Sequence, residues 1–170
     1  MQFTLERHKV KLANFNCRAE KHGEEVEPAA DLKIEMIAPN DVLSEFDSQL
    51  KSSLYRKPDG VGDQQELIDT PGYLPKLRFP KLGTMQWGAE YPGATFVIHL
   101  TQEVEDDVLL ADCTVDKFSF DCMDGGSVAL SFRVKCKPDE HSAGKLYLLS
   151  QHDVEASLFA PEPQQLQAAG

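Results

Sequence analysis

A chain of 170 residues has the length of a single domain, and contents of 41% hydrophobic and 26% charged residues are ordinary for a globular protein. These values exclude collagen, low-complexity polymers and wholly disordered chains, and four cysteines are too few for a disulfide-stapled scaffold. The 17 basic and 28 acidic residues give a net charge of −11, and no stretch approaches the ~18 apolar residues that a membrane span needs.

The negative charge is concentrated in the second half of the chain. Residues 1–85 carry 12 basic and 14 acidic side chains, whereas residues 86–170 carry 5 and 14, and Lys and Arg are absent between Lys81 and Lys117. Because nucleic-acid affinity depends largely on cations that neutralise phosphates, this window disfavours DNA or RNA and favours a basic protein partner. The candidate partner-binding residues are its acidic side chains Glu90, Glu103, Glu105, Asp106, Asp107, Asp112 and Asp116.

The first residues and the cysteine spacing bear on the cell compartment. Residues 1–7 lack the apolar core and the small-residue cleavage site of a signal peptide, which predicts a cytoplasmic protein. The cysteines form no C-x-x-C pair, so their spacing indicates neither a zinc knuckle nor a thioredoxin-like motif. We expect four reduced thiols.

The opening of the chain predicts β structure followed by a loop. Apolar residues alternate with charged ones over residues 2–14, which indicates a strand or a strand pair that breaks near Arg7 and His8. Residues 21–28 are charged and contain a glycine and a proline, so we expect a loop there.

A half-buried strand and a helix are expected next. Residues 31–36 alternate cleanly, and the sequence predicts that the apolar members face inward. Pro39 ends this strand, and the following Asn40 and Asp41 are suited to cap a helix. Apolar residues at helical spacing then predict an amphipathic helix over 41–54.

The middle of the chain contains a long irregular segment. Residues 56–92 hold five prolines and five glycines, which indicates a long loop with short edge strands around 77–79 and 85–87. Strict alternation predicts a strong strand over 94–101. An acidic run interrupts it, and an apolar stretch restarts at 108–110.

The clearest local feature is a β-hairpin. Apolar residues occupy alternate positions on both sides of the segment 124–126. Because facing residues of an antiparallel pair share a side, Cys122 is expected to pair with Val128, and Phe120 with Leu130. Residues 124–126 then form the turn, where glycine supplies the left-handed backbone.

In the first strand of this hairpin the apolar residues are even-numbered from Phe118 onward but odd-numbered at Cys113 and Val115. A one-residue bulge near 116–117 restores the apolar face and sets Val115 opposite Val134. The same register places Cys113 opposite Cys136, so their sulfur atoms are expected to be neighbours. We interpret them as two reduced thiols of the core.

The end of the chain completes a mainly β pattern. Residues 142–150 predict a short helix, 153–159 predict a last strand, and 161–170 predict a flexible tail. The expected fold is mainly β (α+β): one domain over residues 1–160, built as a single antiparallel β-sheet or sandwich with one or two short helices.

The titratable residues form no catalytic motif. The five histidines lack H-x₃-H or H-E-x-x-H spacing, no serine stands in a G-x-S-x-G setting, and no phosphate-binding G-K-[ST] ending is present. The acidic run 103–107 lacks the calcium-loop pattern, so a solvated turn is favoured there over a docking surface, and a Ca²⁺ or Mg²⁺ site is the least favoured. We expect no enzyme activity, no metal and no cofactor.

A second hypothesis uses the more balanced first half of the chain to bind single-stranded DNA. Its cations would contact phosphates, and aromatic side chains of the Pro/Gly-rich region would stack on bases. The candidates are Lys9, Lys11, Arg18, Lys51, Arg56, Lys57, Lys76, Arg78, Trp87 and Tyr91. A third hypothesis, a small-ligand binder, needs a pocket beneath the Pro/Gly-rich segment. Exposed strand edges are compatible with a homodimer.

Six short segments spread over residues 20–158 carry a family resemblance. They are 21–25 (KHGEE), 28–34 (PAADLKI), 39–43 (PNDVL), 110–118 (LADCTVDKF), 124–128 (DGGSV) and 131–134 (SFRV). Together they resemble an uncharacterised family of tailed-phage and prophage early-region proteins, encoded near recombination or replication genes. The resemblance lends no catalytic residues and implies an accessory role in phage DNA metabolism or host takeover.

Charge and resemblance together lead to one functional hypothesis and one alternative. The first is a non-enzymatic phage accessory protein of the bacterial cytoplasm, whose acidic surface binds a basic protein such as a host defence or nucleic-acid enzyme. The alternative is a recombination or replication accessory that binds single-stranded DNA directly.

Overall fold

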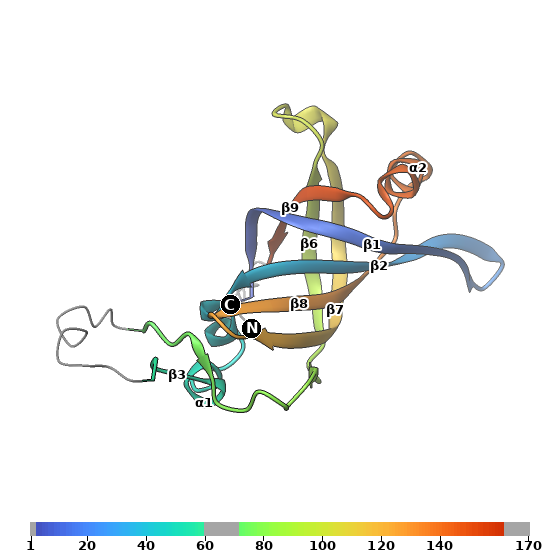
Figure 1. Ribbon diagram of the computed structural model, residues 1–170. Helices are drawn as coiled ribbons and strands as arrows, with labels where there is room; N and C mark the ends of the chain where they lie inside the picture. Colours follow the sequence, from blue (N-terminus) through green and yellow to red (C-terminus); the bar gives the residue numbers. More distant parts are fainter. Residues whose placement is uncertain (1–2, 60–71, 162–170) are drawn as a thin grey trace, which may run out of the picture.

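The protein is a closed β-barrel with short helices at its two ends. The computed structural model describes residues 3–59 and 72–161, and 56% of the structure is strand. Six antiparallel strands pair in the order β7-β6-β9-β1-β2-β8, and β8 pairs again with β7 (Figure 1). Their bounds are β1 Leu5–His22, β2 Glu25–Pro39, β6 Tyr91–His99, β7 Val108–Met123, β8 Ser127–Cys136 and β9 Asp153–Phe159.

The prediction of a mainly β protein with an antiparallel sheet is confirmed, but the sheet closes into a barrel rather than forming a simple sheet or sandwich. The pairing of β7 with β8 joins the two ends of the sheet, so each barrel strand has neighbours on both sides. A seventh strand, β5, pairs with residues 118–120 of β7, beyond the part of β7 that pairs with β6. The shorter elements are the 3₁₀ helices η1 Asn40–Glu45 and η3 Val104–Asp106, the helices α1 Leu50–Leu54 and α2 Glu140–Leu149, and the strands β3 Tyr55–Arg56, β4 Lys76–Leu77 and β5 Met85–Trp87.

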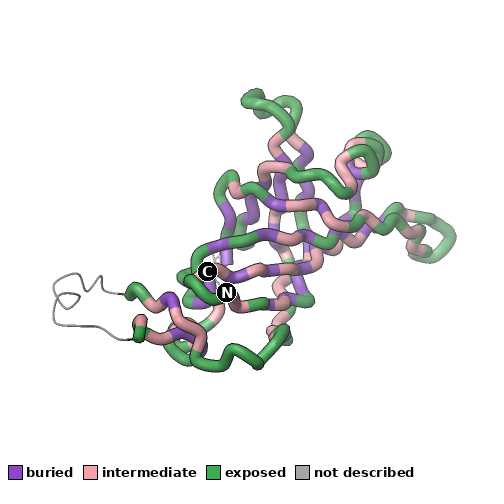
Figure 2. Tube along the Cα trace, viewed as in Figure 1, coloured by how far each residue is buried: buried purple, intermediate pink, exposed green. Residues whose placement is uncertain are grey.

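Period-two alternation of apolar residues fills the barrel interior. Along β8 each second residue from Val128 to Cys136 is buried and the residues between them face outward (Figure 2). The inward residues of 31–36 are Leu32, Ile34 and Met36, as the alternation predicted.

The two ends of the barrel are closed by different elements. At one end Phe46, which follows η1, stacks on Phe3 at 5.1 Å between ring centroids and meets Phe118 edge-on at 5.0 Å. The opposite end, to which β8 runs, is covered by α2 through the fully buried Leu146. Because β2 begins opposite the end of β8, the β1–β2 turn and the β6–β7 turn lie at the same end as α2.

The predicted β7–β8 hairpin is confirmed in register and in turn. Cys122 faces Val128 and Phe120 faces Leu130, and the register shifts after Asp116, where Lys117 has a φ of 52°. Gly125 in the turn has a φ of 99°, a conformation that a side chain disfavours. All four cysteines are free, and the two predicted core thiols are buried.

Two other local predictions are wrong. Residues 21–28 form the ends of β1 and β2 rather than a loop, because Gly23, with a φ of 70°, turns the chain tightly enough for His22 to pair with Glu25. The helix predicted over 41–54 is instead η1 followed by α1. Asn40 does not cap it, because its side-chain amide donates to the carbonyl of Leu74 at 2.7 Å.

The remaining expectations on the second half of the chain have mixed outcomes. Strands β5 and β9 occupy the predicted ranges 85–87 and 153–159, and α2 begins two residues before the predicted start at 142. The tail predicted to be flexible lies, from residue 162, outside the described residues.

The hydroxyl of Tyr55 links the short β3–β4 pair to the β7–β8 turn by hydrogen bonds. This fully buried side chain places its hydroxyl 2.9 Å from the carbonyl oxygens of both Met123 and Ser127, which share its proton. Tyr55→Phe is expected to lower the free energy of unfolding by about 1–2 kcal/mol, because the carbonyls of Met123 and Ser127 lose the hydrogen bonds from this buried hydroxyl. Urea denaturation measures the change. Tyr147→Phe, at a residue 72% exposed, is the control and should leave stability unchanged.

Candidate functional site

The candidate acidic residues separate into an exposed group and an engaged group. Glu103, Glu105 and Asp106 are exposed in the turn between β6 and β7, which projects from the α2 end of the barrel (Figures 1 and 2). We call residues 100–106 the β6–β7 tip. In the described part of the chain none of these three carboxylates lies in an ion pair.

Hydrogen bonds within the tip give it a defined shape. The Thr101 hydroxyl donates to Asp106 Oδ2 at 3.0 Å and accepts from the Glu103 amide at 3.0 Å. The amides of Asp106 and Asp107 donate to the carbonyls of Glu103 and Val104, which makes η3. The carboxylates are therefore held on an ordered turn rather than on a flexible run.

A buried Asp–His–Ser chain fixes the base of the tip. Asp107 Oδ2 accepts from His99 Nδ1 at 2.9 Å, and His99 Nε2 lies 2.8 Å from Ser157 Oγ, which also accepts from the Arg7 amide at 3.0 Å. His99 ends β6, Asp107 precedes β7 and Ser157 belongs to β9. We call these three residues the pin, because they join both ends of the tip to a third strand.

The distances within the pin resemble those of a hydrolase triad, but a substrate cannot reach its serine oxygen. Ser157 is only 2% exposed, and its oxygen already interacts with His99 and the Arg7 amide, so an acyl group has no approach to it. The arrangement therefore positions the tip. Sequence reasoning missed it, because residues 99, 107 and 157 have no motif spacing and only strand pairing brings them together.

Asp107 contributes negative charge beneath the tip without being exposed itself. Its side chain is 8% exposed, and Oδ1 is buried with no hydrogen-bond partner in the described residues. The carboxylate is thus only partly compensated by His99. Asp107 belongs to the base of the site, whereas the sequence placed it on the binding surface.

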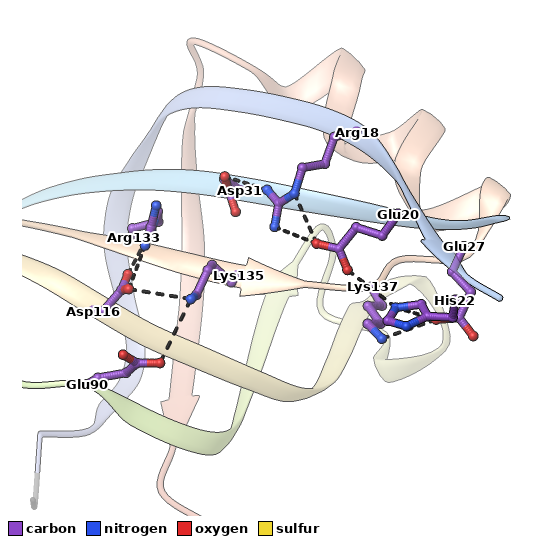
Figure 3. A network of polar contacts seen from close by, with 10 residues as sticks. All are labelled: Arg18, Glu20, His22, Glu27, Asp31, Glu90, Asp116, Arg133, Lys135 and Lys137. Carbon is purple, nitrogen blue, oxygen red and sulfur yellow. Dashed lines mark hydrogen bonds and ion pairs between the residues drawn. The ribbon is translucent and has the colours of Figure 1, made fainter.

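Asp116 and Glu90 lie away from the tip and are engaged by cations. Arg133 donates two hydrogen bonds to Asp116, at 2.7 and 2.6 Å, and Lys135 lies 3.7 Å from Asp116 and 3.9 Å from Glu90 (Figure 3). The Arg133 hydrogen bonds lower the pKa of Asp116. The cation-free window of the sequence did not predict this, because the neutralising side chains come from β8.

Asp112 is exposed on β7 at a φ of 52°, and no ion pair involves it in the described ranges. It lies four residues beyond the start of β7 and so stands apart from the tip. Of the seven predicted carboxylates, the structure brings three together on one exposed turn.

Five of the eight candidate DNA-binding cations lie in or directly beside α1, β3 and β4, which we call the lobe, and most of these five contribute to the fold. Lys51 pairs with Asp41 at 2.6 Å with its own side chain only 12% exposed, and Lys76 lies 3.8 Å from Asp124. Arg78 donates to the carbonyls of Ser52 and Tyr55. Of the remaining two candidates of the lobe, Arg56 ends β3 and pairs with Asp59, and Lys57 follows it.

The aromatic and cationic candidates outside this lobe belong to strands of the sheet. Trp87 packs edge-on against Phe46, and Tyr91 against Phe118, so both rings contribute to the barrel end. Lys9, Lys11 and Arg18 belong to β1, where Arg18 pairs with Asp31 and Glu20 (Figure 3).

Hollows on the surface give little support for a small-ligand site. Beneath the Pro/Gly-rich segment the hollow lined by Leu77, Phe79 and Met85 measures about 100 Å³, below the ~300–1,000 Å³ of ligand pockets. A wider hollow of about 750 Å³ lies on the outer faces of β1, β2, β8 and β7. Four of its charged side chains form the ion pairs Lys33–Glu35 and Lys9–Asp153, and none of its lining residues comes from the Pro/Gly-rich segment beneath which the small-ligand hypothesis needs a pocket.

Within residues 3–59 and 72–161 no group of three or more His, Cys, Asp or Glu side chains is arranged to hold a metal ion. No helix of these ranges has the length and apolarity to cross a membrane. Comparison of the chain with protein-family models, with curated proteins and with solved structures found no match. The phage-family resemblance stays a prediction, and the site is interpreted from its own geometry.

Proposed function

We propose that this protein is a non-enzymatic accessory protein of a phage or prophage that binds a basic protein partner through the β6–β7 tip. The supporting observation is the set of three exposed carboxylates, Glu103, Glu105 and Asp106, which lack ion-pair partners in the described residues and stand on an ordered turn. Charges that are held in place before binding lose less conformational entropy on association.

The negative charge of the β6–β7 tip indicates the class of partner. Uncompensated carboxylates steer a cationic surface toward the tip and repel phosphate, so a protein with a basic face is favoured over nucleic acid. A host defence protein or nucleic-acid enzyme presents such a face, and occupation of it would block access to DNA or RNA. Binding of this kind needs no catalytic group.

The proposal is tested by capture from host cells with the tagged full chain, followed by affinity measurement for each purified partner. Glu103→Lys with Glu105→Lys leaves the Thr101–Asp106 hydrogen bond in place and should weaken the binding of a true partner about tenfold or more. Glu24→Lys with Glu25→Lys changes the charge equally in the separate β1–β2 turn and should have little effect.

Salt provides the second arm of this test. Raising the ionic strength from about 0.05 M to about 0.5 M should weaken the wild-type complex, because exposed charges are screened. The proposal is contradicted if the partner binds the Glu103→Lys, Glu105→Lys protein as tightly as wild type. It is also contradicted if the affinity for wild type does not change with ionic strength.

Direct binding of single-stranded DNA is the second candidate, and the gathering of Lys51, Arg56, Lys57, Lys76 and Arg78 in one lobe favours it. Fluorescence anisotropy with a labelled oligonucleotide separates the two functions. If the Glu103→Lys, Glu105→Lys protein still binds the oligonucleotide with a micromolar, salt-sensitive affinity, this result would support DNA binding and argue against the protein partner.

A further inference from the structure

Exposed apolar side chains gather at the same end of the barrel as the acidic tip. The described residues include eleven large hydrophobic side chains that are exposed, and five of them lie at the end of β6, in the tip, at the start of β7 or on α2. They are Leu100, Val104, Leu109, Tyr147 and Leu148. Val104 is 77% exposed, Leu148 74% and Leu109 62%, and a concentration of this kind marks a contact surface.

The apolar and acidic side chains share one surface because α2 touches the tip. Lys145 of α2 donates to the carbonyl of Asp106 at 3.5 Å, and Leu148, three residues later, lies on the same side of the helix. On β7 the buried Val108 and Leu110 flank Leu109, so strand alternation turns Leu109 outward. We call Val104, Leu109 and Leu148 the apolar patch.

Two kinds of occupant fit this surface poorly. A second copy of the chain would place carboxylates against carboxylates across a two-fold axis. Anionic phospholipid headgroups would meet the same repulsion. The surface therefore fits an occupant that combines cations with apolar side chains.

The strands at this end are paired unequally. Near the tip β6 pairs with both β7 and β9, whereas the pairing of β7 with β8 begins at Thr114, so residues 108–113 of β7 have a strand partner on the β6 side only. A helix with cations along one side and an apolar stripe along the other is the recognition mode that matches both the carboxylates and the apolar patch.

Resting on the proposed function, we infer that the partner element bound at the tip is a Lys- or Arg-rich amphipathic helix. Its apolar stripe covers the apolar patch, and its cations reach Glu103, Glu105 and Asp106. The partly compensated carboxylate of Asp107 adds to the negative potential at the base of the tip.

The test uses the full chain and a labelled synthetic helix of about 18 residues, five turns, with leucines at helical spacing and lysines elsewhere. A peptide of the same composition in scrambled order, which cannot form an apolar stripe as a helix, is the matched control. Fluorescence anisotropy should show the ordered peptide binding about tenfold or more tighter than the scrambled one. Circular dichroism should show the ordered peptide gaining helicity when bound.

Variants separate the apolar contribution from the charge contribution. Val104→Ser, Leu109→Ser and Leu148→Ser together should reduce the ordered peptide to the affinity of the scrambled one. The matched control, Val26→Ser, Ile37→Ser and Phe79→Ser, changes exposed apolar residues elsewhere and should have no effect. Equal binding of both peptides, or wild-type binding by the patch variant, would overturn the inference.

The proposed function fails in a different way from this inference. If Glu103→Lys with Glu105→Lys leaves the binding of both peptides unchanged, the acidic tip is not a docking site. If that variant weakens both peptides equally while the apolar patch makes no difference, the acidic site stands and only the amphipathic helix is rejected.

Discussion

His99→Ala is expected to lower the free energy of unfolding by about 3 kcal/mol. The substitution leaves the Asp107 carboxylate, 8% exposed, and the Ser157 hydroxyl without the imidazole that joins them. Two buried polar groups then lose a partner at once. Urea denaturation, followed by the fluorescence of Trp87, the sole tryptophan, measures this loss.

The control for this variant is His152→Ala, at an exposed histidine whose side chain makes no hydrogen bond within residues 3–59 and 72–161. Its effect should stay within about 0.5 kcal/mol. Hydrogen exchange at the amides of Asp106 and Asp107 should accelerate in His99→Ala, whereas the amide of Gly125, in the β7–β8 turn, should keep its rate. Equal stability of His99→Ala and wild type would show that the pin does not hold the tip.

Arg133→Met is expected to cost about 3 kcal/mol near neutral pH, because it removes both hydrogen bonds to the nearly buried Asp116 carboxylate. Lys135, 3.7 Å away, compensates only in part. Lys9→Met breaks the exposed Lys9–Asp153 pair and should change stability by less than about 1 kcal/mol. Urea denaturation of the three proteins at one pH gives the comparison.

The cost of Arg133→Met should depend on pH in a defined direction. Hydrogen bonding to Arg133 lowers the pKa of Asp116 in the folded chain below its ordinary value of 3.8. The pair therefore contributes its full stability above that value and loses it as pH falls through the lower folded pKa. The difference between wild type and Arg133→Met should shrink when denaturation is repeated at about pH 3. A difference that stays constant from about pH 7 to about pH 3 would contradict this account.

These two groups of residues matter differently for function. The pin lies at the base of the tip, so its loss should disturb partner binding as well as stability. The Asp116–Arg133 pair lies between β7 and β8, so its loss should affect stability while the affinity of the folded protein for a tip-binding partner is kept.

Local pattern was enough to predict the strands and the hairpin. The alternation around Cys122 and Val128 set both the register and the position of the turn, because a slip of one residue would send every apolar side chain to the wrong face. The same reasoning failed at residues 21–28, where composition indicated a loop. A single tight turn at Gly23 was sufficient to let both strands continue.

The candidate site was predicted only in part. The acidic run gave Glu103, Glu105 and Asp106 as surface carboxylates, and consecutive charges between two apolar strands are a local signal. Two other predicted members are engaged by residues from elsewhere, Asp107 by His99 and Asp116 by Arg133. The His99 contact has no signature in spacing, whereas the Asp116–Arg133 pair is implied by the hairpin register that sets Val115 opposite Val134, a consequence that the charge count alone does not show.

The sequence by itself determined the β character, the hairpin register and the excess of negative charge, because these follow from alternation and composition over short stretches. Only the tertiary structure decided that the sheet closes on itself, which carboxylates stay free and what surrounds them. The non-local pairings of β9 with β6 and of β2 with β8 close the barrel, and the first of them brings residue 157 to residue 99. Such contacts depend on the relative placement of distant segments, which no local period encodes.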